Sequence, residues 1–346
     1  MNTNPNKDEE SSELFEHYRF EVDPGQSPLR LDKFLMLRIE NASRNKIQNA
    51  IKAGNVRVNE QEIKSSYKVR PADTISIVME HPRREVEIFP QDIPIEVVFE
   101  DKDIMLINKE PDMVVHPGHA NYEGTLLNAI AFHLEHHSKT PNKEKRAYLV
   151  HRIDKDTSGL ILAAKSELAQ SKLGYQFFHH TVKRNYHALV WGDFEEDEGR
   201  IEGHIGRDLK DRRRMYVYED GSYGKEAVTH YKVIRRFGYV SLVECQLETG
   251  RTHQIRAHFK HIKHPLFNDA TYGGDVILKG TTFSKYKQFI ENCFRIMPRQ
   301  ALHAKSLGFV HPGTGKEMNF ESELPADMQG VLEKWDIYTR YRTPDN

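Results

Sequence analysis

Hydrophobic and polar positions follow two different periods along the chain, one near its start and one over the remainder. Near the start, a set of apolar residues recurs at the spacing of a helix: Leu31, Phe34, Leu35 and Ile39. A second helix is expected to begin after Ser43, a favourable N-cap, and to end at Gly54. Ile47 and Ile51 would form its buried face. Between residues 56 and 78, short alternating segments predict strands.

From residue 93 to about residue 335, most apolar residues alternate in short segments rich in β-branched and aromatic side chains, as in strands. These segments are IEVVFE, IMLIN, MVVH, LILAAK, YHALVWG, AVTHYKVIRR and VSLVECQLE. Two others, TLLNAIAFHLEHH and SELAQSKLGYQFF, have the period of a helix. We therefore predict an α+β domain over residues 93–335, built on a mixed, largely antiparallel sheet.

The remaining parts of the chain differ from these two domains in composition. The first 27 residues are polar and acidic and contain the turn signal Pro24-Gly25, and a polar stretch with two prolines lies near residues 81–91. The expected order is a disordered acidic tail over 1–27, a small domain over 28–78, a linker over 79–92, the α+β domain over 93–335 and a C-terminal tail over 336–346.

Charge changes this picture because it is unevenly distributed, although the net charge is only −1. Residues 1–27 carry two basic and seven acidic side chains, whereas residues 28–75 carry ten basic and five acidic ones. A second basic cluster contains Arg207, Lys210, Arg212, Arg213 and Arg214. Such segregation is typical of proteins that bind polyanions, although a basic run can also be an ordinary solvated face.

Composition also limits the class of protein. No run of about 18 apolar residues is present, so a membrane span is not expected. The acidic start lacks the features of a signal peptide. The two cysteines, Cys245 and Cys293, exclude a disulfide framework and a cysteine-rich zinc ribbon. With so few cysteines, we expect a protein of the reducing cytoplasm. We also expect a monomer, because nothing in the sequence demands an interface.

The small basic domain carries a first resemblance. The segment RLDKFL…SRNKIQNAIKAGNVRVNEQEIKSSYKVRPADTISI is similar to the alpha-L RNA-binding motif, first known from small-subunit ribosomal protein four, over residues 29–77. The resemblance implies that four basic residues face RNA: Arg44, Lys46, Lys52 and Arg57. Without the resemblance, a small helical domain that binds protein remains an alternative.

In the larger domain, polar residues concentrate in LVHRIDKDTSGLILAAKS, residues 149–166. A polar loop between two apolar runs suggests a functional loop held by a rigid sheet. From the local residues alone, Asp154 could equally form an Asx-type turn that caps nearby amides.

HRIDKDTSG resembles the HRLDxxTSG signature of the RluA-type pseudouridine synthases, with Ile153 in place of leucine. Other segments match that family in its order: MLINKEPDMVVHPG, VKRNYHALVWG, LETGRTHQIRAH, HPLFNDATYGG and RQALHAKSLGFVHP. The resemblance implies that Asp154 is the catalytic residue, that Tyr186 stacks on the target base and that Arg256 is the ion-pair partner of Asp154. Further residues of these motifs are expected to contact RNA: His151, Arg152, Thr157, Arg251 and His253.

The chain departs from the family pattern at three loop positions. Glu110 and Asp112 stand where the family has proline and glycine, and Asn268 stands where it has glycine. Glycine adopts left-handed backbone conformations freely, and asparagine tolerates them better than most residues. These departures concern loop geometry rather than chemistry.

The implied reaction breaks the N1–C1′ bond of uridine, rotates the base and joins C5 to C1′, so it needs no redox cofactor, metal or group donor. A carboxylate could attack C1′, attack C6 of the ring or remove a sugar proton, and the sequence does not choose among these routes. Each route requires an ionised Asp154, which a neighbouring arginine would favour. The target base must also be flipped out of folded RNA.

Several other readings are weaker. The histidines fit no metalloprotease spacing. Asp154 and Asp156 lie two residues apart on one loop, so they need not flank a sugar as a glycosidase pair does. No phosphate-binding glycine motif is present. A non-catalytic RNA-binding ribosome-assembly factor and a pseudouridine synthase that acts on transfer RNA remain alternatives. The attached alpha-L module resembles that of the ribosomal large-subunit synthases of the C and D type, which favours structured large-subunit ribosomal RNA as the partner.

Overall fold

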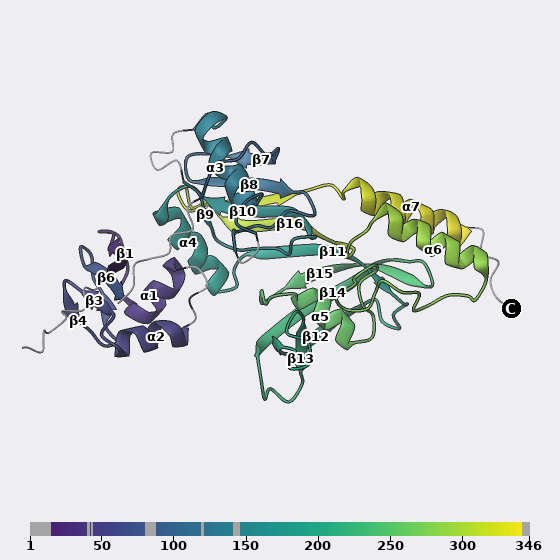
Figure 1. Ribbon diagram of the computed structural model, residues 1–346, viewed down its shortest axis with the longest axis horizontal. Coiled ribbons are helices and arrows are strands. Elements are labelled where there is room, and N and C mark those ends of the chain that lie inside the picture. Colours follow the sequence, from purple (N-terminus) through teal and green to yellow (C-terminus); the bar gives the residue numbers. More distant parts are fainter. Residues whose placement is uncertain are drawn as a thin grey trace, which may run out of the picture. The chain divides into compact units, whose positions relative to one another are not determined.

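The computed structural model describes residues 15–39, 42, 44–79, 88–118, 121–140 and 146–340. The chain forms two compact units, Met1–Glu87 and Ile88–Asn346 (Figure 1), and each is described by itself. The expected N-cap Ser43, most of the expected linker and the outermost residues of both expected tails lie outside the described residues. No helix among the described residues is both long enough and apolar enough to cross a membrane.

The N-terminal unit combines two helices with short antiparallel strands. A four-stranded sheet has the order β1-β6-β3-β4, and β2 pairs with β5. The elements are β1 (Phe15–Glu21), β2 (Leu29–Arg30), α1 (Leu31–Arg38), α2 (Arg44–Lys52), β3 (Val56–Val58), β4 (Gln61–Glu62), β5 (Lys68–Val69) and β6 (Thr74–Met79).

The periodic residues of the sequence form the core of this unit. Leu31, Phe34 and Leu35 of α1 are fully buried, and Ile47 and Ile51 of α2 pack into the same cluster. The predicted helices are therefore confirmed, because each buries its apolar face against the other elements of the unit. Gly54 follows α2 with a φ of 76°, the left-handed conformation that often ends a helix.

The expected disordered tail over residues 1–27 is wrong from residue 15 onward. Residues Phe15–Glu21 form β1, which pairs antiparallel with β6, and Phe20 and Val22 are buried. Tyr18, Phe20 and Val22 alternate with polar residues, so the strand pattern was present within an acidic composition. Pairing with β6 and burial against Phe34 stabilise a segment whose charge alone suggested disorder.

The C-terminal unit is an α+β domain with one large sheet, as predicted. The sheet order is β13-β12-β14-β15-β11-β16-β10-β8-β7, with β17 on β16 and β9 on β10. Among the described strands, only β10 and β16 pair in parallel. Its elements are β7 (Glu96–Glu100), β8 (Ile104–Lys109), α3 (Leu126–His136), β9 (Tyr148–Leu149), β10 (Ser158–Ala164), α4 (Glu167–Phe178), β11 (Lys183–Trp191), β12 (Glu198–Arg207), β13 (Met215–Tyr218), β14 (Lys225–Arg236), β15 (Val240–Leu247), α5 (Gln254–His261), α6 (Ser284–Ile296), β16 (Leu302–Val310), β17 (Glu317–Glu321) and α7 (Ala326–Arg340).

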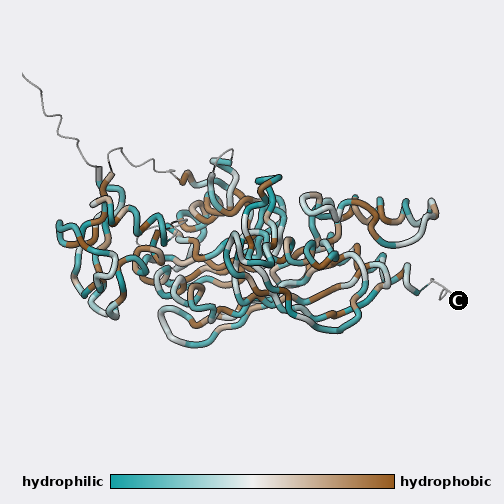
Figure 2. Tube along the Cα trace, turned by 90° about the horizontal axis from the view of Figure 1, so that it is seen from below, coloured by the Kyte–Doolittle hydropathy of each residue, from teal (hydrophilic) through white to brown (hydrophobic). Residues whose placement is uncertain are grey.

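Strand β10 is buried on both faces because helices cover it from both sides. Ile161 and Ala163 face the cluster that contains α3, and Leu160 and Leu162 face the cluster that contains α4. Figure 2 shows hydrophobic residues following the strands of this sheet, with hydrophilic residues in the connecting loops. This packing makes β10 a rigid support for the loop that precedes it.

The expected C-terminal tail from residue 336 lies partly inside a helix. Helix α7 continues to Arg340 and runs beside α6 (Figure 1), where Trp335 is fully buried. Phe289 and Tyr338 pack against Trp335 with ring centroids 4.9 and 5.6 Å away. The aromatic cluster therefore extends the domain beyond the end that the sequence predicted.

Candidate active site

The loop that carries Asp154 connects β9 to β10. The backbone N–H of Thr157 donates to the carbonyl of Asp154 over 3.1 Å, which closes a tight turn. The Asp154 carboxylate does not cap a neighbouring backbone amide. Its Oδ2 accepts a hydrogen bond from Nη1 of Arg256 over 3.0 Å, and the side chain is 22% exposed. The turn thus leaves the carboxylate directed across the pocket.

Two buried cations hold this loop through its backbone. Nζ of Lys109 donates to the carbonyls of Glu110, Met113 and Lys155. Burial lowers the pKa of Lys109 to about 8. On the other side, Nη1 of Arg299 donates to the Asp156 carbonyl over 2.9 Å. Backbone contacts of this kind position the loop without occupying the carboxylate of Asp154.

A glycine allows the loop to enter the sheet. Gly159 has a φ of 108°, and a Cβ at this position would lie 2.3 Å from the carbonyl oxygen of Ala304. Gly159 lies opposite Ala304 in the single parallel pairing, between β10 and β16. Any side chain here would separate the two strands, so the glycine of the TSG motif is a steric requirement.

Arg256 on α5 links two carboxylates. Its Nε and Nη2 bind Asp269 over 2.7 and 2.9 Å, and its Nη1 binds Asp154. The ring of Tyr272 lies 5.1 Å from its guanidinium carbon. Burial by itself lowers the pKa of Arg256, but hydrogen bonds and charge attraction from Asp269 and Asp154 raise it above its usual value. Arg256 is therefore a fixed cation with one N–H donor aimed at Asp154.

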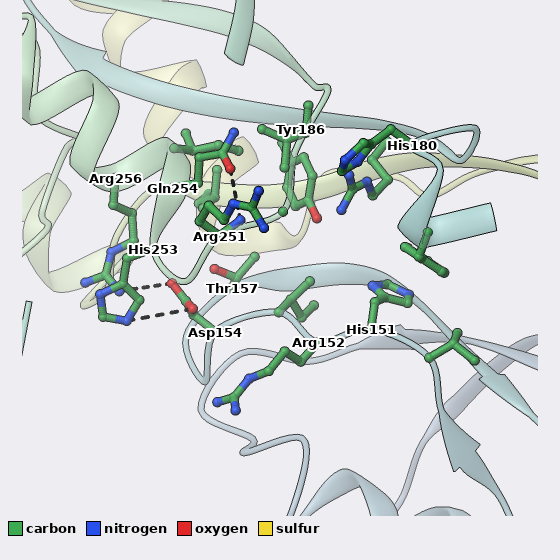
Figure 3. A pocket seen from close by; sticks show the side chains of 18 of the residues that line it. His151, Arg152, Asp154, Thr157, His180, Tyr186, Arg251, His253, Gln254 and Arg256 are labelled. Carbon is green, nitrogen blue, oxygen red and sulfur yellow. Dashed lines mark hydrogen bonds and ion pairs between the residues drawn. The ribbon is translucent and has the colours of Figure 1, made fainter. Parts of the chain in front are cut away.

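His253 approaches the other oxygen of Asp154 (Figure 3). Its Nε2 lies 3.8 Å from Oδ1 of Asp154, and its Nδ1 lies 3.1 Å from the hydroxyl of Tyr272. The backbone of His253 is left-handed, with a φ of 53°, at the start of α5. Burial lowers the pKa of His253, against the attraction of Asp154, which favours a neutral imidazole.

Tyr186 on β11 forms another wall of the same pocket. Its side chain is 8% exposed, and burial raises the pKa of its hydroxyl, so the phenol stays protonated. The pocket has a volume of about 400 Å³, which lies in the usual range for small-molecule sites. Besides Tyr186, its lining includes seven other predicted side chains: His151, Arg152, Asp154, Thr157, Arg251, His253 and Arg256.

His151 and Gln254 also line the pocket, and each accepts a hydrogen bond from a backbone N–H. Nε2 of His151 accepts a hydrogen bond from the backbone N–H of Leu162, and its ring stacks on Phe177 with centroids 4.7 Å apart. Burial lowers the pKa of His151 to about 3, and nearby Arg184 contributes to the decrease. Oε1 of Gln254 accepts from the backbone N–H of Arg251 over 2.9 Å. His151 is therefore a neutral hydrogen-bond acceptor in this fold.

The four basic residues predicted for RNA binding lie in the N-terminal unit, on α2 and β3. Lys46 and Lys52 are exposed on α2. Nε of Arg44 lies 3.1 Å from the buried carboxylate of Asp32, and hydrogen bonds from Arg30, Gln48 and Arg44 hold the pKa of Asp32 well below its usual value despite its burial. Nε of Arg57 is buried and has no acceptor among the described residues. Arg44 thus also has a structural contact.

Two of the three departures from the family pattern adopt left-handed backbone conformations. Asp112 has a φ of 62° and Asn268 a φ of 57°. Asp112 pairs with Lys155 of the loop over 2.7 Å, and Nδ2 of Asn268 donates to the carbonyl of Met297 over 2.7 Å. The turns therefore keep the conformation that glycine would allow, and side-chain contacts accompany it.

Asp269 and Arg184 are not among the predicted site residues. Asp269 stands inside the motif HPLFNDATYGG, and its place in that motif was the available signal. Arg184 stands two residues before Tyr186 and lines the pocket. The pairing of Asp269 with Arg256 does not follow from their spacing in the sequence, because the two residues meet only after α5 and the following loop have folded.

Comparison with known proteins identifies the family of the chain that carries this site. The model of the RNA pseudouridylate synthase family matches residues 103–261, and the S4 domain model matches residues 29–75. An uncharacterized RNA pseudouridine synthase of Chlorobaculum parvum is 45% identical over 317 residues, which cover 91% of this chain and 96% of that protein. The chain belongs to the RNA pseudouridylate synthase family. It is therefore an isomerase with an N-terminal S4 RNA-binding domain, as its motifs indicated.

Other relatives of this synthase carry more specific names. Ribosomal large subunit pseudouridine synthase D of Zymomonas mobilis is 38% identical and covers 90% of this chain and 95% of its own length. The homologous synthase D of Vibrio vulnificus is also 38% identical, over 90% of this chain and 92% of its own. The solved structure of human RNA pseudouridylate synthase domain containing 4 covers 70% of this chain and 93% of its own, with a TM-score of 0.53 and 21% identity, and shows the same fold.

Proposed function

We propose that this synthase isomerises specific uridines of large-subunit ribosomal RNA, with Asp154 as its catalytic carboxylate. The observation that carries the proposal is that Asp154 is the only carboxylate among the described residues lining the pocket, where Arg256 binds it over 3.0 Å. The relatives named ribosomal large subunit pseudouridine synthase D support the choice of RNA.

The two oxygens of Asp154 have different neighbours, which supports different roles for them in the reaction. Oδ2 accepts the hydrogen bond from Arg256, whereas Oδ1 accepts none from the described residues and lies 3.8 Å from Nε2 of His253. Arg256 favours the ionised carboxylate, which then presents Oδ1 to the pocket as a nucleophile or a base. Attack at C1′, attack at C6 and removal of a sugar proton all remain compatible with this arrangement.

Tyr186 is proposed to stack on the uracil after the nucleotide has flipped into the pocket. Flipping costs a few kcal/mol, and stacking on an aromatic ring returns about 1–3 kcal/mol per base. During the reaction the N1–C1′ bond breaks, the base turns, C5 bonds to C1′ and the proton from C5 is transferred so that N1 is protonated. A wall that holds the ring by its face permits this rotation, because stacking imposes little in-plane orientation.

The S4 domain is proposed to add sequence-independent affinity through phosphate contacts. Lys46 and Lys52 are exposed on α2, which also carries Arg44, and Arg57 lies on β3. Each phosphate neutralised by such a side chain releases counterions, so binding depends on salt. Structured RNA is therefore the proposed partner of both units.

We further propose that the synthase works as a monomer in the cytoplasm. Cys245 and Cys293 are free and buried, and burial raises the pKa of both thiols, that of Cys293 to about 12. Such thiols form no disulfide and suit a reducing compartment. Sedimentation at micromolar concentration should give the mass of one chain, and a dimer mass would contradict the monomer.

A pseudouridine map of large-subunit ribosomal RNA tests the proposed function. Unmodified transcript is incubated with wild-type protein or with Asp154→Asn, labelled with carbodiimide and read by primer extension. Stops that appear with wild type alone support the activity, the substrate and the catalytic residue together. If wild type gives stops on bulk transfer RNA and none on the ribosomal transcript, the proposed substrate is wrong.

A further inference from the structure

Arg184 is a buried cation in the pocket wall that has no counter-ion among the described residues. Its side chain belongs to β11, the residue is 7% exposed, and its guanidinium carbon lies 5.6 Å from the centroid of the Phe177 ring. Among the described residues, it makes no ion pair and its buried Nε has no hydrogen-bond acceptor. The cost of burying an unpaired charge is large, so such a group indicates a ligand that supplies the missing charge.

The surroundings of Arg184 increase this positive charge. Arg251 and His180 line the same end of the pocket, which we call the cationic end, defined by Arg184, His180 and Arg251. Burial, together with repulsion among these groups, lowers the pKa of both Arg251 and His180. Across the described lining of the pocket, four arginines face a single carboxylate, Asp154: Arg152, Arg184, Arg251 and Arg256.

We propose that Arg184 binds the backbone phosphate next to the target uridine. The proposal rests on the proposed function, because it takes the flipped uridine as the occupant of the pocket. A guanidinium binds phosphate through parallel N–H donors, and no acceptor among the described residues engages the guanidinium of Arg184. A neutral uracil carbonyl would leave the charge of the cationic end uncompensated.

The spacing along β11 fits this assignment. Arg184 and Tyr186 are both buried and lie two residues apart on one face of the strand, a separation of about 7 Å. A base stacked on Tyr186 would therefore place its adjacent phosphate, one sugar away, within reach of Arg184. Gly250 leaves space for the guanidinium, because a Cβ there would lie 2.5 Å from Nη1 of Arg184.

A methylphosphonate scan tests the proposal. In a short RNA that contains the modified uridine, one phosphate at a time is replaced by its uncharged methylphosphonate, and kcat/KM is measured. With wild type, one linkage beside the target uridine should lower kcat/KM about 10- to 100-fold, the usual effect of losing a charge-assisted hydrogen bond. Arg184→Met should show a similar loss on unmodified RNA and no further loss at that linkage.

Two controls separate this binding role from a structural one. Arg295→Gln removes an exposed arginine of α6 and should stay as sensitive to each linkage as wild type. Without RNA, Arg184→Met should melt at or above the temperature of wild type, because it removes an unpaired buried charge. If Arg184→Met melts several degrees lower, or keeps the wild-type sensitivity at every linkage, the proposal is overturned.

Failure of the proposed function would look different. Wild type would then form no pseudouridine in the ribosomal transcript. In that case the methylphosphonate scan is replaced by measuring how tightly the full chain binds uridine, uridine 3′-monophosphate and uridine 5′-monophosphate. Tighter binding of one monophosphate by wild type, absent in Arg184→Met, would support the phosphate site on its own. Equal binding of all three probes by wild type would refute it.

Discussion

Arg256 joins the partly buried Asp154 to the fully buried Asp269, with Nη1 3.0 Å from the first carboxylate and Nε and Nη2 2.7 and 2.9 Å from the second. Asp269 is 1% exposed and binds two of the three guanidinium nitrogens of Arg256. The third nitrogen, Nη1, is therefore fixed in direction before any substrate arrives. This relationship determines what replacement of either carboxylate should do.

Asp154→Asn should lower pseudouridine formation by at least about 10³-fold, because the amide is a poor nucleophile and a poor base. Its folding should change little, since Arg256 keeps its two bonds to Asp269. Single-turnover assays and thermal melting measure the two effects. Turnover within tenfold of wild type would remove Asp154 from the chemistry.

Asp269→Asn should reduce stability as well as activity. Breaking a buried ion pair by removing one partner costs about 3–5 kcal/mol, and the freed guanidinium would no longer aim at Asp154. Urea unfolding should give a lower midpoint, and kcat should fall more than RNA affinity. The matched control is Asp211→Asn, which removes the carboxylate that pairs with Arg213 at the surface. It should leave the urea midpoint and kcat near their wild-type values. A selective loss of RNA affinity in Asp269→Asn would argue against the positioning role.

Tyr186→Phe should keep RNA affinity, because the ring that stacks is preserved. Tyr186→Ala should weaken binding by about 1–3 kcal/mol, the usual contribution of base stacking. Filter binding of a short RNA with the target uridine compares the two variants. Equal affinity of the alanine variant and wild type would show that Tyr186 does not stack on the base.

Lys46→Gln combined with Lys52→Gln should reduce the salt dependence of RNA binding. Each lost phosphate contact lowers the slope of log K against log salt by about 0.7–0.9. Lys285→Gln with Lys287→Gln, two exposed residues of α6, removes the same charge from the other unit and serves as the control. An identical slope for the α2 variant and wild type would exclude these lysines from the RNA interface.

Acid should destabilise the fold through its buried histidines. Burial lowers the pKa of His151 to about 3, so below its unfolded value near 6.5 the unfolded chain binds the proton more readily than the folded one. The unfolding free energy should therefore decrease from pH 6.5 towards pH 3, by about 1.4 kcal/mol per pH unit for this group. His258 and His303, each with a pKa lowered to about 4 by burial, act in the same direction.

His151→Gln tests the contribution of this histidine, because glutamine can accept the hydrogen bond from Leu162 without titrating. Its stability should fall less steeply over this pH range than that of wild type. The exposed His179→Gln should retain the wild-type profile. Parallel profiles for His151→Gln and wild type would mean that His151 titrates normally in the folded protein.

Much of the fold could be predicted because its signals are local. The helical spacing of Leu31, Phe34 and Leu35 identified α1, and alternating segments identified a largely antiparallel sheet. Strand β1 was missed although Tyr18 and Phe20 alternate correctly, because an isolated strand has no stability until β6 pairs with it.

The motifs likewise supplied Asp154, Tyr186 and Arg256 as candidates, since the sequence determines which chemical groups the chain carries. Their catalytic roles stay predictions. Only the tertiary structure decided that Arg256 bridges Asp154, 102 positions away, and Asp269, and that no described residue pairs with Arg184. Whether a charge is paired depends on which atoms surround it after folding, and spacing along the chain does not contain that information.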